Sequence, residues 1–96
     1  MLILNKKVGT KGMFYVEGEK GEILAEMVYT MPSFDRMIIE HTEVSDELRG
    51  QNVGYQLVHT AVEYARTHQV KIIPLCPFAN SVFKKKPEFA DVLFKA

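Results

Sequence analysis

Cysteine is almost absent from this chain of 96 residues, which carries only Cys76. A lone thiol cannot form an internal disulfide bond, so the fold must be stable without covalent cross-links. No apolar run approaches the roughly 20 residues needed to cross a bilayer. The N-terminal segment 1–7 is short and interrupted by Asn5, Lys6 and Lys7, which is not typical of a signal peptide. We therefore expect a cytoplasmic protein without a membrane partner.

The chain also lacks an excess of charge of either sign. Twelve basic and twelve acidic residues give a formal net charge of zero, which argues against a nucleic-acid-binding protein with a broad basic surface. Hydrophobic residues make up 47% and charged residues 25% of the chain, as in ordinary globular proteins. The length favours one domain over residues 1–96. We see no metal-ligand pattern and expect no metal.

The first half of the chain has the pattern of β-strands. Residues 13–16 and 23–31 are β-prone and flank a polar turn that contains glycine, so we expect them to pair as a hairpin. Pro32 and Ser33 are expected to end the second of these strands. Residues 37–44 are rich in Ile, Val and Thr and predict a third strand.

The second half changes to a helical period. Apolar residues spaced by three and four predict one long helix from Val53 to about His68: Val53, Leu57, Val58, Ala61, Val62 and Ala65. A short strand over 70–73 and a short helix over 78–85 should follow, and the tail 89–94 is apolar enough to pack back. The pattern predicts an α+β fold with a mixed, mostly antiparallel sheet. Strands 37–44 and 70–73 should run parallel through a right-handed crossover.

The junction between the third strand and the long helix, residues 44–54, suits a phosphate. A helix N-terminus has unpaired N–H groups and a partial positive charge. Gly50 and Gly54 allow close approach to the backbone, and Arg49 adds a permanent cation. The alternative is an ordinary loop in which Gly54 only lets the helix pack tightly on the sheet.

Residues 44–54 resemble motif A of the GNAT superfamily of N-acetyltransferases, whose pattern is Gln/Arg-x-x-Gly-x-Gly/Ala. Arg49 takes the first position and Gly54 the last, while Asn52 stands where the middle glycine is usual. Asn tolerates the left-handed conformation better than other non-glycine residues. Residues 40–44 and 72–78 are similar to a subgroup of very small GNAT-like proteins, so the resemblance covers over half the chain.

The resemblance implies a GNAT-like fold and an acetyl-coenzyme A cofactor. The coenzyme A pyrophosphate would lie on the amides of residues 51–54, and the pantetheine arm would lie in a wedge between strands 37–44 and 70–73. Asn80 would hydrogen-bond the cofactor, and Lys84 would contact its 3′-phosphate. The alternative is that the basic run 84–86 is ordinary solvent-exposed surface. The implied cofactor-binding residues are Thr42, Val44, Arg49, Gly50, Gln51, Asn52, Val53, Gly54, Asn80 and Lys84.

Acetyl transfer to an amine needs a base for the proton of the amine and an acid for the leaving thiolate. Glu40 and His41 lie on the strand that would line the wedge, and an imidazole suits a base near neutral pH. In a regular strand Glu40 and Thr42 would share one face, and His41 and Glu43 the other. Alternatively, His41 is a structural residue of the strand, held in place by packing or by a hydrogen bond.

Cys76 is the second catalytic candidate. It follows a strand end between Pro74 and Pro77 and would take the acetyl group as a nucleophile, with His41 as a conceivable neighbour. The alternative is a small buried hydrophobe, since free cysteines are among the most buried residues.

Phe83 stands where many GNAT enzymes place a tyrosine that serves as the acid, and a phenyl ring has no proton to give. The leading hypothesis is an acetyl-coenzyme A-dependent N-acetyltransferase with an unidentified amine acceptor, either a small molecule or a protein. The alternatives are a non-catalytic acyl-coenzyme A-binding or sensing module, and a protein-interaction module that keeps the fold without the ligand.

Overall fold

The computed structural model describes residues 1–95. In chain order its elements are β1 (Leu4–Val8), β2 (Lys11–Glu17), β3 (Ile23–Ser33), β4 (Arg36–Val44), the 3₁₀ turn η1 (Asp46–Leu48), α1 (Val53–His68), β5 (Lys71–Pro74), α2 (Pro77–Lys85) and the 3₁₀ segment η2 (Pro87–Val92). The long helix begins and ends at the residues that the apolar spacing predicts. Within residues 1–95, no helix is long and apolar enough to span a membrane.

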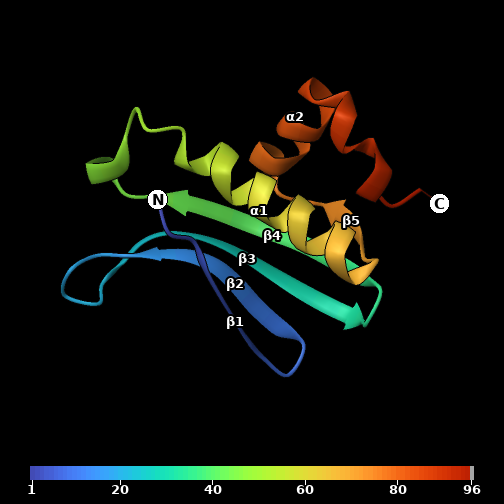
Figure 1. The fold of residues 1–96 in the computed structure, drawn as a ribbon, viewed down its shortest axis with the longest axis horizontal. Helices are drawn as coiled ribbons and strands as arrows, with labels where there is room; N and C mark the ends of the chain where they lie inside the picture. Colours follow the sequence, from blue (N-terminus) through green and yellow to red (C-terminus); the bar gives the residue numbers. More distant parts are fainter. Residues whose placement is uncertain (96) are drawn as a thin grey trace.

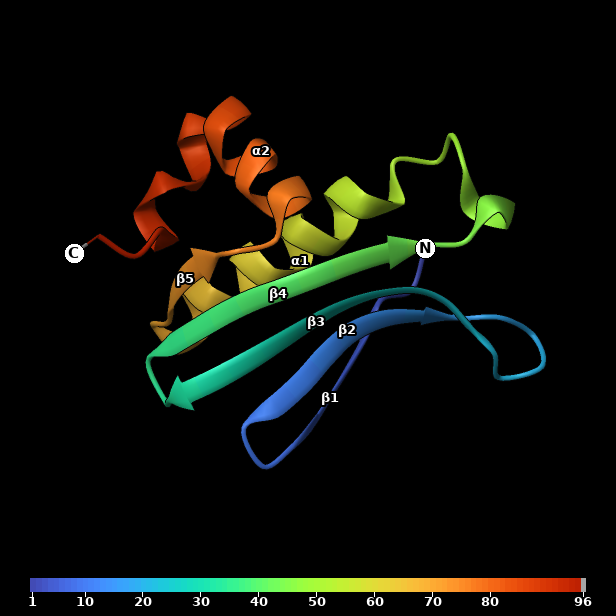
Figure 2. The ribbon, with the colours of Figure 1, turned by 180° about the vertical axis from the view of Figure 1, so that it is seen from behind.

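The five strands form one mixed sheet in the order β1-β2-β3-β4-β5. Neighbours from β1 to β4 are antiparallel, and β4 and β5 are parallel. This confirms the predicted fold class and the parallel pairing through α1. Figures 1 and 2 show α1 lying across the sheet, with α2 beside it near β4 and β5.

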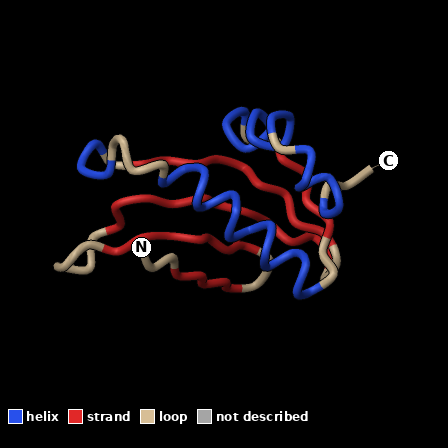
Figure 3. The backbone as a smooth tube through the Cα atoms, turned by 45° about the horizontal axis from the view of Figure 1, so that its top comes forward, coloured by secondary structure: helices blue, strands red, loops and turns tan. Residues whose placement is uncertain are grey.

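The core lies between the sheet and α1. Alternate residues of β3 face α1 and are buried: Ala25, Met27, Tyr29 and Met31. They pack against the predicted apolar stripe of α1, whose residues Val53, Leu57, Val58, Ala61, Val62 and Ala65 are all buried. Figure 3 shows α1 crossing one face of the strands. In the part of the chain that the structure describes, the other face of the sheet carries no helix, and it is called the open face below.

Strand β1 is a difference from the sequence-based expectation. Residues 4–8 pair with β2 although four of the five are exposed, so they lack the apolar alternation that marks a strand. The buried Tyr29 hydroxyl donates a 2.8 Å hydrogen bond to Asn5 Oδ1 and ties β1 to the core. Burial raises the pKa of Tyr29, which keeps this hydroxyl protonated as a donor.

The expectation that Pro32 and Ser33 end the second strand is wrong, because β3 continues to Ser33 and pairs there with Arg36. The pairing is irregular between Thr30 and Ser33. An irregular position of this kind accommodates a proline, which has no N–H to give to the ladder. The tail packs back as predicted, with Phe89 and Val92 buried.

Candidate active site

Strands β4 and β5 part in the middle of the sheet. Their parallel register runs from Arg36–Lys71 to Ile39–Pro74 and then stops. The carbonyl of Ile39 accepts hydrogen bonds from both Leu75 N (3.1 Å) and Cys76 N (3.0 Å), which turns the chain away into α2. Beyond Ile39, no strand among the described residues pairs with this edge of β4. Residues 40–44 therefore present a free backbone edge beside the N-terminus of α2.

The loop from Arg49 to Asn52 leads into the N-terminus of α1. Gly50 and Asn52 both adopt the left-handed conformation, with φ of 83° and 61°, as expected for an Asn in place of glycine. Asn52 is the N-cap residue but its side chain makes no capping bond. Within residues 1–95, no acceptor takes the amides of residues 52–55. Four donors thus point out of the end of one helix, which is a common setting for an anion.

Two residues of this loop differ from their expected roles. The Arg49 guanidinium is largely exposed and lies 2.5 Å from the Asp46 carboxylate. The cation that we expect to contact the phosphate therefore already forms an ion pair within the protein. Gly54 lies against the ring of Phe78, because a Cβ at Gly54 would come within 2.7 Å of that ring. The group that comes close to the backbone of Gly54 is therefore the Phe78 side chain of α2. This agrees with the alternative that Gly54 allows tight packing of the helix.

A β-bulge in β4 changes which side chains share a face. Val28 pairs with His41 and Tyr29 with Ile39, so Glu40 has no partner of its own on β3. The predicted grouping of Glu40 with Thr42 is wrong for this reason. Glu40 reaches Lys11 and Thr30 on the open face, where His41 also lies.

Thr42 faces the helices and meets Cys76. Thr42 pairs with the buried Met27, and its Oγ1 lies 3.5 Å from Cys76 Sγ. Cys76 is 3% exposed and is the N-cap residue of α2. His41 and Cys76 lie on opposite sides of the free edge of β4, so Thr42 is the neighbour of Cys76 and His41 is not.

The polar groups of the open face form two pairs next to the free edge. His41 Nε2 lies 3.4 Å from Glu26 Oε2, and both side chains are partly exposed. Glu40 accepts hydrogen bonds from the ammonium of Lys11 and, at 3.1 Å, from the hydroxyl of Thr30. The Lys11 hydrogen bond is the main reason that the pKa of Glu40 lies below its ordinary value. The Glu40 carboxylate is thus already engaged by two hydrogen bonds. The half-exposed His41 side chain is the better candidate for a base.

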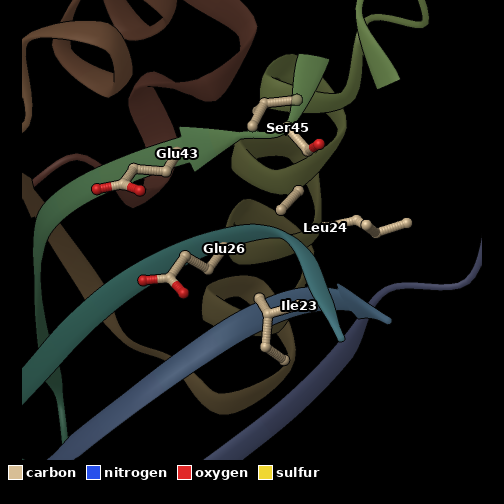
Figure 4. Close-up of a pocket in the computed structure, with 7 residues that line it drawn as sticks. Ile23, Leu24, Glu26, Glu43 and Ser45 are labelled. Carbon is tan, nitrogen blue, oxygen red and sulfur yellow. The ribbon is translucent and has the colours of Figure 1, made fainter. Parts of the chain in front are cut away.

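A shallow pocket of about 220 Å³ lies where β4 ends and β3 begins. Glu26 and Glu43 line it and face each other directly across the two strands. Figure 4 shows their carboxylates extending in the same direction, with Ser45 at the start of the following loop. Glu26 is not among the residues that the sequence singles out. The only sign of Glu26 in the sequence is that it is a charged residue within the largely apolar run 23–31. Its position near His41 follows from the pairing of β3 with β4.

The remaining predicted residues lie on α2. Asn80 Nδ2 donates a 3.3 Å hydrogen bond to the carbonyl of Pro74, so this amide links α2 to the end of β5. Lys84 is exposed in the last turn of α2. Phe83 is 7% exposed and packs edge-on to Phe89, with centroids 6.2 Å apart. Phe83 belongs to the core, and the residue contributes no proton donor.

Comparisons with known proteins identify the family of the chain. The family model described as GCN5-related N-acetyl-transferase matches residues 13–92. The solution NMR structure of a GCN5-like candidate N-acetyltransferase from Staphylococcus aureus is 36% identical, with a TM-score of 0.73 over 97% of this chain and 89% of the other. No curated protein matches the chain.

Larger acetyltransferases share the fold. A GNAT family acetyltransferase from Elizabethkingia anophelis, solved with acetyl-CoA bound, is 16% identical, with a TM-score of 0.59 over 81% of this chain and 53% of the other. Nourseothricin acetyltransferase is 27% identical, with a TM-score of 0.53 over 68% of this chain and 39% of the other. The chain belongs to the GCN5-related N-acetyltransferase family and is an acyltransferase.

Proposed function

We propose that the chain binds acetyl-coenzyme A and transfers its acetyl group to the nitrogen of an amine acceptor. The observation that carries the proposal is that the amides of residues 52–55, at the start of α1, have no acceptor within residues 1–95. They lie beyond the end of β4, whose own edge pairs with no described strand from residue 40 onward. The E. anophelis relative, which shares the fold, has acetyl-CoA bound.

The residues present fit the cofactor in two places. The unpaired amides of 52–55 suit the pyrophosphate, because backbone donors at a helix N-terminus stabilise negative charge. The free backbone groups of β4 near Thr42 and Val44 suit the amides of the pantetheine arm, which would extend the sheet ladder. Arg49 is held by Asp46, so we expect it to contribute less than the amides.

Acetyl-coenzyme A supplies a thioester-activated acetyl group when bound. In transfer to an amine, the acceptor nitrogen would form a bond to the acetyl carbon as the carbon–sulfur bond breaks. Coenzyme A would leave as its thiolate and take a proton from water, and the acceptor nitrogen would lose a proton to a base. His41 is the base that suits this proton, since its side chain is half exposed and Glu26 lies 3.4 Å from its Nε2. The carboxylates of Glu26 and Glu43 in the adjoining pocket suit an acceptor that arrives as an ammonium ion.

Cys76 lies on the helix side of the same edge. Its sulfur is almost buried and contacts Thr42, so a covalent acetyl intermediate would require the acetyl carbon to reach a closed position. Direct attack by the acceptor amine needs no such opening. We therefore assign Cys76 and Thr42 to the wall beside the thioester and His41 to proton removal.

Calorimetry with acetyl-coenzyme A tests the cofactor site. Wild type should bind with a dissociation constant on the order of 10 µM. Asn52→Val should weaken binding about 10-fold, because a β-branched residue is strained at φ 61°, while Asn52→Gly keeps the turn and serves as the matched control. No binding by wild type would contradict the proposal.

Thiol release with a panel of amines tests the chemistry. His41→Gln should lower kcat about 100-fold, the usual scale for loss of a general base.

Cys76→Ala should retain kcat within about 3-fold if transfer is direct. An acetylated Cys76 peptide found by mass spectrometry would overturn direct transfer. Binding without turnover of any amine would favour a non-catalytic acyl-coenzyme A module.

A further inference from the structure

A pocket with mainly apolar walls lies on the open face of the sheet. Its volume is about 260 Å³, and it is lined by Lys6, Val8, Lys11, Gly12, Met13 and Val28. Val8 is apolar and 84% exposed. The helices of residues 1–95 do not cover this face (Figure 2). Since a sheet face in contact with water usually carries polar residues, an uncovered apolar pocket on it suits a ligand.

One row of cross-strand neighbours joins this pocket to His41. Val28 of β3 pairs with Met13 on one side and with His41 on the other. Met13 in turn pairs with Lys6 of β1. Directly paired residues have Cβ atoms about 5 Å apart. A molecule whose nitrogen lies at His41 therefore enters the pocket by crossing the side chain of Val28 alone.

The two lysines at the pocket direct their ammonium groups to other partners. Lys11 forms an ion pair with Glu40, and the Lys6 ammonium lies 5.1 Å from the centre of the Tyr15 ring. Long basic side chains commonly cover apolar surface with their methylene groups while the charged end stays in water. The rim of the pocket is thus positively charged, although its walls are apolar.

Negative charge lies at the other end of this path. Glu26 and Glu43 face each other across β3 and β4, and Glu26 Oε2 lies 3.4 Å from His41 Nε2. From β4 towards β1 the open face therefore passes from carboxylates, over apolar side chains, to lysines. A complementary ligand has one cation followed by an uncharged apolar body. A second cation at its far end would be repelled by the lysines.

We infer that the acceptor is a primary amine with a single positive charge and an apolar body, and that this body lies in the pocket. The inference rests on the proposed function, because it takes His41, Glu26 and Glu43 as the place of the amine. Strand β2 lies two strand spacings, or roughly 10 Å, from β4. A straight chain of about six carbon atoms covers most of that distance and ends near Val8 and Met13.

A diamine and a protein lysine fit this surface less well. The second ammonium group of a diamine of the same length would lie at the rim, next to Lys6. The hydrocarbon stem of a protein lysine is shorter than the path into the pocket. Its peptide groups would lose water against the apolar walls without gaining hydrogen-bond partners. The pocket therefore favours a small amine over both.

A series of primary alkylamines at saturating acetyl-coenzyme A tests the inference, because these amines ionise alike and differ in apolar length. Complete burial of a methylene group favours binding about 4-fold, and about 2-fold is expected in this open pocket. From propylamine to hexylamine kcat/KM should therefore rise about 8-fold. Diaminohexane, with an amine at each end, should fall at least about 10-fold below hexylamine although it offers more reactive nitrogen.

Lys6→Glu reverses the charge at the rim. It should raise kcat/KM for diaminohexane about 5-fold and leave that for hexylamine within about 2-fold. Lys20→Glu makes the same charge change in the turn between β2 and β3, away from the pocket, and should change neither value. Both residues are exposed, so the variants should fold, and circular dichroism checks this.

Val8→Thr makes one wall of the pocket more polar. It should lower the ratio of kcat/KM for hexylamine to that for propylamine from about 8 to about 4. Leu2→Thr is the matched control, because Leu2 is also apolar and exposed but lies outside the pocket lining. The ratio should be preserved in this control.

NMR titration with hexylamine, without acetyl-coenzyme A, reports on the pocket in the absence of turnover. The methyl signals of Val8, Met13 and Val28 should shift with a dissociation constant on the order of 5 mM. Diaminohexane should bind about 10-fold more weakly. Methyl shifts without acetylation of any amine would contradict the proposed function and still support the pocket as an amine site.

Two results would overturn the inference while acetyl transfer stands. One is a kcat/KM that does not depend on the chain length of the amine. The other is a higher kcat/KM for diaminohexane or for Nα-acetyl-lysine amide than for hexylamine. Either result would show that the body of the acceptor lies outside the apolar pocket.

Discussion

Glu40 shows how one residue out of register changes a site. As the extra residue of the β4 bulge, it turns to the open face and meets Lys11 and Thr30, 29 and 10 positions away in the chain. The same bulge leaves His41 on that face and sends Thr42 to Cys76. One extra residue thereby places the proposed base and the thiol on opposite sides of the free edge.

Lys11→Met should raise the pKa of Glu40 towards its ordinary value of about 4.5, because the main hydrogen bond that stabilises the carboxylate is lost. The pKa is read from an NMR titration of the Glu40 carboxyl carbon. Lys7→Met, on β1 and away from Glu40, is the control. An unchanged Glu40 pKa in Lys11→Met would contradict the assigned pair.

The lowered pKa of Glu40 also sets the sign of a pH effect. A carboxyl whose folded pKa is depressed contributes stability above its unfolded pKa, and this contribution is lost as pH falls through the folded value. The stability difference between wild type and Lys11→Met should therefore be present at neutral pH and shrink below about pH 4.5. Urea unfolding at pH 7 and pH 3 measures it.

At the scale of elements, α1 and α2 meet through Gly54 and Phe78. The Phe78 ring occupies the space where a Cβ at position 54 would lie. Gly54 is the second residue of α1, so the contact brings α2 next to the unpaired amides. A glycine here serves the packing of the two helices.

The Gly54 contact predicts a change of sign in a double-mutant cycle. In wild type, Gly54→Ala should destabilise the fold by roughly 1 kcal/mol, because the added methyl group collides with the Phe78 ring. In a Phe78→Ala background the same change should stabilise by about 0.5–1 kcal/mol, since alanine favours a helix. Urea unfolding of the four proteins measures the cycle. Equal effects in both backgrounds would show that the ring is not the obstacle.

At the scale of the whole molecule, Arg66 joins α1 to the C-terminal segment. Its guanidinium donates two 2.9 Å hydrogen bonds to Asp91 and one to the carbonyl of Glu88. The Arg66 hydrogen bond is the main reason that the pKa of Asp91 is lowered. Just beyond, Phe94 N donates to the carbonyl of Ile72, so the tail adds to the edge of the sheet at β5.

Asp91→Asn should loosen the tail without unfolding the sheet. The Phe94 amide should exchange its hydrogen about 3- to 10-fold faster, because local opening of the tail becomes easier. Hydrogen exchange followed by NMR measures this rate. Glu88→Gln lies in the same segment and changes a side chain with no hydrogen bond in the described residues, so it should leave the rate unchanged. Faster exchange throughout the sheet would instead indicate global destabilisation.

The sequence by itself determined the elements whose signals are local. The three- and four-residue apolar spacing located α1 from Val53 to His68, and β-prone runs located β2, β3 and β4 to within a few residues. The glycine-bearing junction before α1 indicated a phosphate site because the unpaired donors of a helix end follow from helix geometry alone. The resemblance to motif A identified the family from the same segment.

Only the tertiary structure decided what depends on pairing between distant segments. Strand β1 forms through its partner β2 and the hydrogen bond from Tyr29, not through an apolar pattern of its own. The register with β3 puts the bulge at Glu40, which regular alternation places on the wrong face. The contact of Cys76 with Thr42 requires β5 to leave β4 after Ile39. Such contacts join residues far apart in the chain, so no local spacing in the sequence specifies them.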